Sequence, residues 1–149
     1  MDLERGAYHF YKAVLERHRE EDFSRVIDLL ARAEEGHAHL IYQFYKQEVL
    51  EQGQKEAQPF AELYAALPGE VIEGGASRAT MEEMLDDLGD EPCLDIIEMA
   101  ISIEYAAFDL YRNMADHFQG TRMEEAFLSI AQAEKEHMRI AGEALTCCR

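Results

Sequence analysis

The chain repeats part of itself at an interval of 100 residues, and the repeat carries charged side chains at fixed positions. The segment MDLERGAYHFY aligns with ISIEYAAFDLY, and LLARAEEGHAHL aligns with SIAQAEKEHMRI. The two copies are identical at these pairs of positions: Glu4 and Glu104, Ala7 and Ala107, Tyr11 and Tyr111, Ala31 and Ala131, Ala33 and Ala133, Glu34 and Glu134, and His37 and His137. Self-similarity at a fixed period indicates a duplicated structural unit. The fold is therefore expected to contain two structurally equivalent sets of glutamate and histidine side chains.

Each half of the chain is predicted to be a helical hairpin. Apolar residues recur every three or four positions over long stretches, which is the period of an α-helix. In each half the two repeated glutamates lie 30 residues apart, and the midpoints, residues 19 and 119, fall at predicted turns. Since a helix rises ~1.5 Å per residue, two arms of equal length bring the glutamates level with each other. The chain is therefore predicted to be all-α, with antiparallel hairpins at about residues 1–53 and 91–146.

The middle third of the chain is predicted to connect the two hairpins, at about residues 54–90. Pro59, Pro68 and the Gly74-Gly75 pair interrupt the helical periodicity there, as these residues do at turns and loops. Two short helices are expected within this connector. Joined by so long a crossover, residues 1–149 are predicted to form a single four-helix domain.

The repeated acids are predicted to point into the bundle rather than to solvent. At ~100° per residue, Glu34 shares a helical stripe with Ile27 and Leu30, and His37 lies at its edge. Burying ionised carboxylates without partners is strongly unfavourable, so cations are expected among them. Four glutamates with two Glu-x-x-His motifs form the ligand set of di-iron and di-manganese bundles. The candidate metal ligands are Glu4, Glu34, His37, Glu104, Glu134 and His137.

With these motifs the sequence resembles a rubrerythrin-type member of the ferritin-like superfamily. The resemblance is carried by E4-x-x-A-x-x-x-Y11, E34-x-x-H37, E104-x-x-A-x-x-x-Y111 and E134-x-x-H137. It implies a ferritin-like four-helix bundle whose six ligands hold two iron ions, with Tyr11 and Tyr111 hydrogen-bonded to the carboxylates. Manganese and zinc accept the same carboxylate and imidazole ligands. The implied function is that of a non-haem di-iron oxidoreductase that reacts with hydrogen peroxide or dioxygen and protects against oxidative stress.

The sequence departs from the rubrerythrin pattern in three ways. Rubrerythrins that reduce peroxide carry an additional glutamate where this chain has Ala107. The chain has no C-x-x-C pair, so the resemblance implies an external, rubredoxin-like electron donor. Glu4 lies in the first turn of its helix, and because a terminal turn frays, it is the ligand expected to be held least firmly.

Two other functions fit the same motifs. A ferritin-like ferroxidase that handles iron uses similar ligands, and a non-enzymatic helical module can hold metals for structure alone. The family resemblance also implies a homodimer, which the long connector would allow to exchange hairpins.

The composition limits the binding partners and the cellular location that are compatible with this sequence. With 14 basic and 31 acidic residues the net charge is −17, which argues against nucleic acid and anionic membrane surfaces as partners. No apolar stretch reaches the ~18 residues that a membrane helix needs. The cysteines, Cys93, Cys147 and Cys148, are too few and too irregular for a disulfide framework. We therefore expect a reduced, cytoplasmic protein, with Cys93 in the core and the other two in a frayed tail.

Overall fold

The structure is a computed structural model that describes residues 1–148. Six helices account for most of it: α1 (Asp2–Arg17), α2 (Ser24–Glu51), α3 (Phe60–Ala66), α4 (Arg78–Asp86), α5 (Cys93–His117) and α6 (Arg122–Leu145). Within these residues the only β-type pairing is an isolated bridge between Val71 and Ser77. The predicted all-helical class is confirmed, and the four long helices lie where the periodicity placed them.

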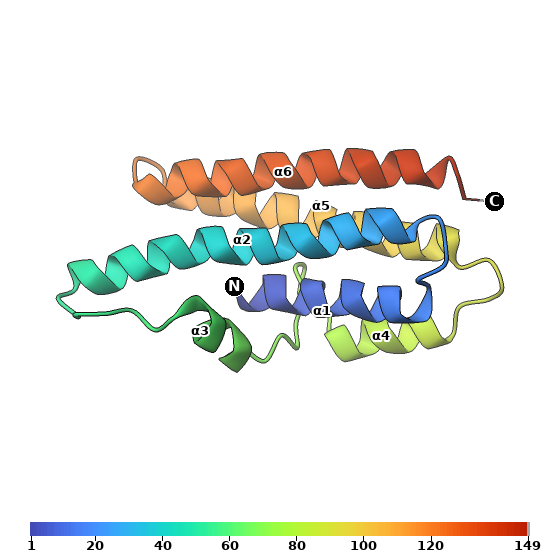
Figure 1. The fold of residues 1–149 in the computed structure, drawn as a ribbon. Helices are drawn as coiled ribbons and strands as arrows, with labels where there is room; N and C mark the ends of the chain where they lie inside the picture. Colours follow the sequence, from blue (N-terminus) through green and yellow to red (C-terminus); the bar gives the residue numbers. More distant parts are fainter. Residues whose placement is uncertain (149) are drawn as a thin grey trace.

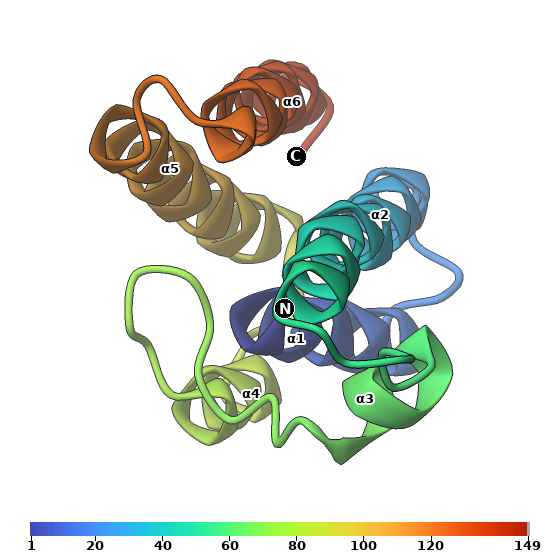
Figure 2. The same ribbon diagram turned by 90° about the vertical axis from the view of Figure 1, so that its left-hand side faces the viewer.

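The long helices form two antiparallel pairs that lie side by side (Figure 1). α1 packs on α2, α5 packs on α6, and α2 contacts α6 between the pairs. An end-on view shows the four helices around a common interior (Figure 2). α6 begins where Thr121 caps it, by accepting a hydrogen bond from the backbone N–H of Met123. Glu124, in the first turn of α6, accepts a hydrogen bond from Gly120 N at 2.7 Å, one residue before the cap.

Two apolar clusters fill the interior, one toward each end. On α5, the first cluster contains Ile96, Ile97, Ala100 and Ile103 and the second contains Ala107, Tyr111 and Ala115, so Glu104 lies between them. On α6, the second cluster contains Phe127, Ile130 and Ala131 and the first contains Ala141, so Glu134 lies between them as well. The repeated glutamates are thus buried in a polar layer between two apolar ones.

The connector folds against α1 on the outside of the four long helices. α4 packs on α1, and the guanidinium of Arg5 lies 5.0 Å from the ring centre of Tyr64 on α3. Between α3 and α4 the chain forms a narrow loop, in which Ile72 N donates to Ala76 O at 2.9 Å. Figures 1 and 2 show this loop reaching past α1 toward α5.

The cysteines differ from the sequence-based expectation. Cys93 at the start of α5 and Cys148 after α6 form a disulfide, with Cα atoms 5.5 Å apart, and Cys147 is free and exposed. The expectation that Cys93 and Cys148 are reduced is therefore wrong in this structure. The cause is the antiparallel pairing of α5 and α6, which brings the two ends of this hairpin together. Among the described residues, no helix combines the length and apolar character required to span a bilayer.

Candidate metal centre

Three of the four long helices supply the residues of the centre. α2 carries Glu34 and His37, α5 carries Glu104, and α6 carries Glu134 and His137. The carboxylates of Glu104 and Glu134 are fully buried, and that of Glu34 is 1 % exposed. The predicted inward orientation of these glutamates is what the structure shows.

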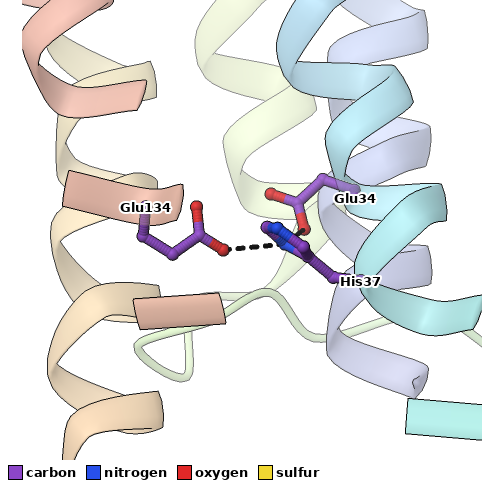
Figure 3. A group of neighbouring side chains, drawn as sticks. All are labelled: Glu34, His37 and Glu134. Carbon is purple, nitrogen blue, oxygen red and sulfur yellow. Dashed lines mark ion pairs between the residues drawn. The ribbon is translucent and has the colours of Figure 1, made fainter. Parts of the chain in front are cut away.

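The five residues form two groups that share one carboxylate. Glu34, His37 and Glu134 make the first group, and Glu104, Glu134 and His137 make the second; in each group the possible ligand atoms lie within 4.8 Å of one another. Figure 3 shows the first group, with Glu34 and His37 facing Glu134 across the space between α2 and α6. His37 Nδ1 lies 2.9 Å from Glu134 Oε1 and 3.9 Å from Glu34 Oε2.

The second group is tied together by one imidazole. His137 Nδ1 lies 3.0 Å from Glu134 Oε2 and 3.1 Å from Glu104 Oε2. Burial alone would lower the pKa of His137, but the hydrogen bonds to Glu104 and Glu134 outweigh it and raise the pKa to about 9. The two imidazole rings, one from each group, lie 5.8 Å apart between centroids.

The buried carboxylates differ in the direction of their pKa shifts. Burial raises the pKa of Glu104 to about 8, and burial and the nearby carboxylates raise the pKa of Glu34 well above its usual range. Burial would also raise the pKa of Glu134, but hydrogen bonding from His137 and the proximity of His37 lower it to about 2. Without metal, therefore, Glu134 is the carboxylate that stays ionised between two imidazoles.

Glu4 is buried near the centre but belongs to neither group. Its carboxylate, 1 % exposed, forms an ion pair with the amino group of Met1. The structure therefore brings five of the six predicted ligands together and leaves Glu4 beside them, in the helical turn expected to hold it least firmly.

The two tyrosines of the repeat have different surroundings. The Tyr11 hydroxyl donates to Glu104 Oε1 at 2.5 Å, which is the predicted contact. Tyr111 is also buried, but its ring stacks on Phe127 with 5.9 Å between centroids. Within residues 1–148 its hydroxyl makes no hydrogen bond to a carboxylate, so the structure shows one of the two predicted contacts.

One buried carboxylate near the centre is absent from the sequence-based set. Glu73, in the loop between α3 and α4, is 2 % exposed. Glu4, Glu104 and Glu134 lie close enough that their charges add to burial in raising its pKa well above the usual range. The repeat could not reveal Glu73 because the connector has no second copy. The available signal was local: an acid between the apolar pair Val71-Ile72 and two glycines.

Fold and donor set define this chain as an all-helical protein with a candidate carboxylate–histidine metal centre. Its second hairpin matches the Rubrerythrin family model over residues 95–147, a segment that contains Glu104, Tyr111, Glu134 and His137. The chain is rubrerythrin-like there, which confirms the resemblance predicted from the motifs. Comparison with curated proteins and with solved structures gave no match.

Proposed function

We propose that this chain is a non-haem di-iron oxidoreductase, built on a ferritin-like four-helix bundle, that reacts with hydrogen peroxide or dioxygen. The observation that carries the proposal is the pair of buried carboxylate–imidazole groups sharing Glu134. The rubrerythrin-like character of residues 95–147 supports iron as the metal.

The chemistry of the buried groups fits two cations. Both carboxylate oxygens of Glu34 are buried without a hydrogen-bond donor. Within the described part of the chain, no Lys or Arg forms an ion pair with Glu34, Glu104 or Glu134. Buried acids in this state need a cation or a proton, and oxygen donors with one imidazole each suit iron.

The proposal gives each residue a role. Glu34 and His37 would hold one ion, Glu104 and His137 the other, and Glu134 would contribute to both, with Glu4 beside them. When bound, iron supplies the electron transfer that these side chains lack. The Tyr11 hydroxyl fixes the orientation of Glu104 through Oε1, as hydrogen bonds to metal-binding carboxylates do.

Residues of this chain hold the protons of the proposed centre and restrict its access to water. In the metal-free form, His137 Nδ1 holds a proton between Glu104 and Glu134. Ligands must lose such protons to bind metal, so metal uptake releases protons from this layer. The apolar clusters on either side of the layer restrict water, which strengthens every charge interaction inside it.

Turnover would require electrons from an external donor of the rubredoxin type. We further propose a homodimer in the cytoplasm. Light scattering that shows only monomer would refute the dimer. Thiol trapping in intact cells would test the location, because a Cys93–Cys148 pair that is fully oxidised there contradicts a reducing compartment.

The experiment that tests the function begins with metal analysis of protein purified without oxygen. Wild-type protein should bind two ferrous ions per chain, consume hydrogen peroxide and develop charge-transfer absorption in the near ultraviolet. A His37→Ala, His137→Ala double variant should lose both ions, whereas His117→Ala, whose side chain is exposed on α5, should keep them. Unchanged metal content in the double variant would mean that the site is misassigned. Tight binding of iron without peroxide consumption, in a shell of many subunits, would favour iron storage.

A further inference from the structure

Glu73 is a buried acid that lies in a loop, outside the six helices. Its side chain is 2 % exposed, yet neither carboxylate oxygen has a hydrogen-bond partner. Almost all buried polar atoms in proteins are paired, so an unpaired one calls for a ligand or a proton. A carboxylate is the strongest case, because its ionised form is very unfavourable in an apolar interior.

The backbone fixes where Glu73 lies. On one side the loop rests on α1: Gly69 N donates to Asp2 Oδ1 at 2.7 Å, and a Cβ atom added to Gly6 would lie 2.2 Å from Val71 O. On the other side it touches α5: Gly74 has a φ of +91°, and a Cβ atom added there would lie 2.9 Å from Ala106 Cβ. The loop is therefore wedged between α1 and α5, at the helical turn that follows Glu104.

The charges that act on Glu73 are those of acids in or beside the candidate metal centre. After burial, the charge of Glu73 is the largest contribution to the raised pKa of Glu34, and Glu73 also acts on Tyr11. Glu4, Glu104 and Glu134 act on Glu73 in turn. Five buried carboxylates thus act on one another in this part of the interior, with Glu73, like Glu4, outside the two groups whose possible ligand atoms lie within 4.8 Å of one another. Within residues 1–148, no Lys or Arg forms an ion pair with Glu73.

We propose that Glu73 is an additional ligand of the dinuclear metal centre, a carboxylate delivered by the connector instead of by a helix. This inference rests on the proposed function, since it needs the two ions that the helical residues hold. It follows that docking of the connector on α1 completes the centre, and that the segment between the hairpins has a role in metal binding. A further negative charge at the centre also favours the oxidised over the reduced ions.

A neutral replacement of Glu73 should have opposite effects on the metal-free and metal-loaded protein. Glu73→Gln keeps the shape of the side chain and removes its charge, so the metal-free protein should become more stable at neutral and alkaline pH, because an ionised carboxylate is unfavourable in the interior. Affinity for Co²⁺, followed by visible absorption in an anaerobic titration, should fall by roughly tenfold or more for at least one of the two ions, as loss of even an outer partner does. The midpoint potential of the iron-loaded variant should rise. The control Glu70→Gln makes the same charge change at an exposed position of the connector and should alter none of these.

The outcomes separate this inference from the proposed function. If wild-type protein binds two Co²⁺ ions and Glu73→Gln binds them with unchanged affinity, the inference is overturned and the proposed function stands. If wild-type protein binds fewer than two ions, both fail. A Glu73→Gln protein that is less stable than wild type without metal would show that Glu73 is a structural residue, which also overturns the inference.

Discussion

The Tyr11 hydroxyl on α1 donates a hydrogen bond of 2.5 Å to Oε1 of Glu104 on α5, across 93 residues of sequence. The contact joins the first hairpin to the second through equivalent parts of the repeat. The reciprocal contact is not made: Tyr111 stacks on Phe127, and within residues 1–148 its hydroxyl makes no hydrogen bond to a carboxylate. The sequence repeat is therefore symmetric in residue type but not in the contacts of its tyrosines.

This asymmetry predicts different effects for two matched substitutions. Tyr11→Phe leaves a buried oxygen of Glu104 without its donor, which should lower the stability of the metal-free protein by about 1–3 kcal/mol. The Tyr11 hydrogen bond also lowers the pKa of Glu104, so the variant should hold the Glu104 proton more tightly. We expect metal affinity to fall by roughly 10–100-fold, more at about pH 6.5 than at about pH 8.5. Metal titration with Co²⁺ at both pH values measures this.

Tyr111→Phe is the control for Tyr11→Phe, since it removes a hydroxyl that has no carboxylate partner in the described residues. Its effect on metal affinity should be less than about threefold. Equal losses in the two variants would contradict the assignment of Tyr11 as the residue that orients Glu104.

The helical hairpins and the clustering of five of the six candidate ligands could be predicted because they follow from local periodicity and equal arm lengths. A turn at residue 119 places Glu104 and Glu134 level whatever the rest of the chain does. The same register places residue 93 level with residue 145, three residues before Cys148, which brings the two cysteines close enough for a disulfide. The expectation of reduced cysteines rests instead on their small number and irregular spacing in the sequence, which do not reveal this proximity.

Glu73 could not be predicted in this way. Its burial depends on how an irregular loop docks between α1 and α5, and no periodic pattern records such a contact. Glu4 shows the complementary limit: the repeat assigned it the role of Glu104, but α1 begins at Asp2 whereas α5 begins at Cys93. Glu4 thus lies in a first helical turn, where it meets the amino group of Met1.

The stability of the metal-free protein should decrease as the pH rises from about 5 to about 9. Burial raises the pKa of Glu104 from 4.5 to about 8, so the stabilisation that its proton contributes is complete below about pH 4.5 and is lost as the pH rises through 8. Hydrogen bonds to two carboxylates, despite burial, raise the pKa of His137 from 6.5 to about 9. Its contribution is complete below about pH 6.5 and is lost toward pH 9. Thermal unfolding at about pH 5.5, 7 and 8.5 tests the trend.

Two comparisons test whether the titrating groups of the candidate metal centre cause this decrease in stability with rising pH. In Glu104→Gln the decrease should be shallower, because one of the titrating groups is gone. In metal-loaded protein it should be weaker, since metal replaces the protons and its binding strengthens as the ligands deprotonate. A metal-free melting temperature that rises between about pH 5.5 and 8.5 is incompatible with the assigned proton positions.

The disulfide predicts that Cys148 contributes to the stability of the protein and that the adjacent Cys147 does not. Cys93 and Cys148 are separated by 55 residues in sequence. In the entropic description, closing a loop of this size raises the free energy of the unfolded chain by about 4 kcal/mol. Cys148→Ser should therefore lower the free energy of unfolding by up to about that amount, as measured in urea without reductant. Cys147→Ser should leave it unchanged, and adding reductant should bring wild type to the level of Cys148→Ser. Equal stabilities of the two serine variants would show that the bond does not form in solution.

Docking of the connector on α1 can be tested without changing any carboxylate. Gly6→Ala places a Cβ atom 2.2 Å from Val71 O, a backbone oxygen that can move only if the loop moves. The substitution should destabilise the protein by about 1–3 kcal/mol, as overpacking does, and should weaken Co²⁺ binding because the loop carries Glu73. Gly142→Ala in α6 meets nothing within 4 Å, and since alanine favours helix over glycine it should stabilise by up to about 1 kcal/mol with metal affinity unchanged. Chemical unfolding and metal titration of both variants measure these effects. If Gly6→Ala lost stability but bound Co²⁺ as tightly as wild type, docking of the loop and completion of the metal centre would be independent of each other.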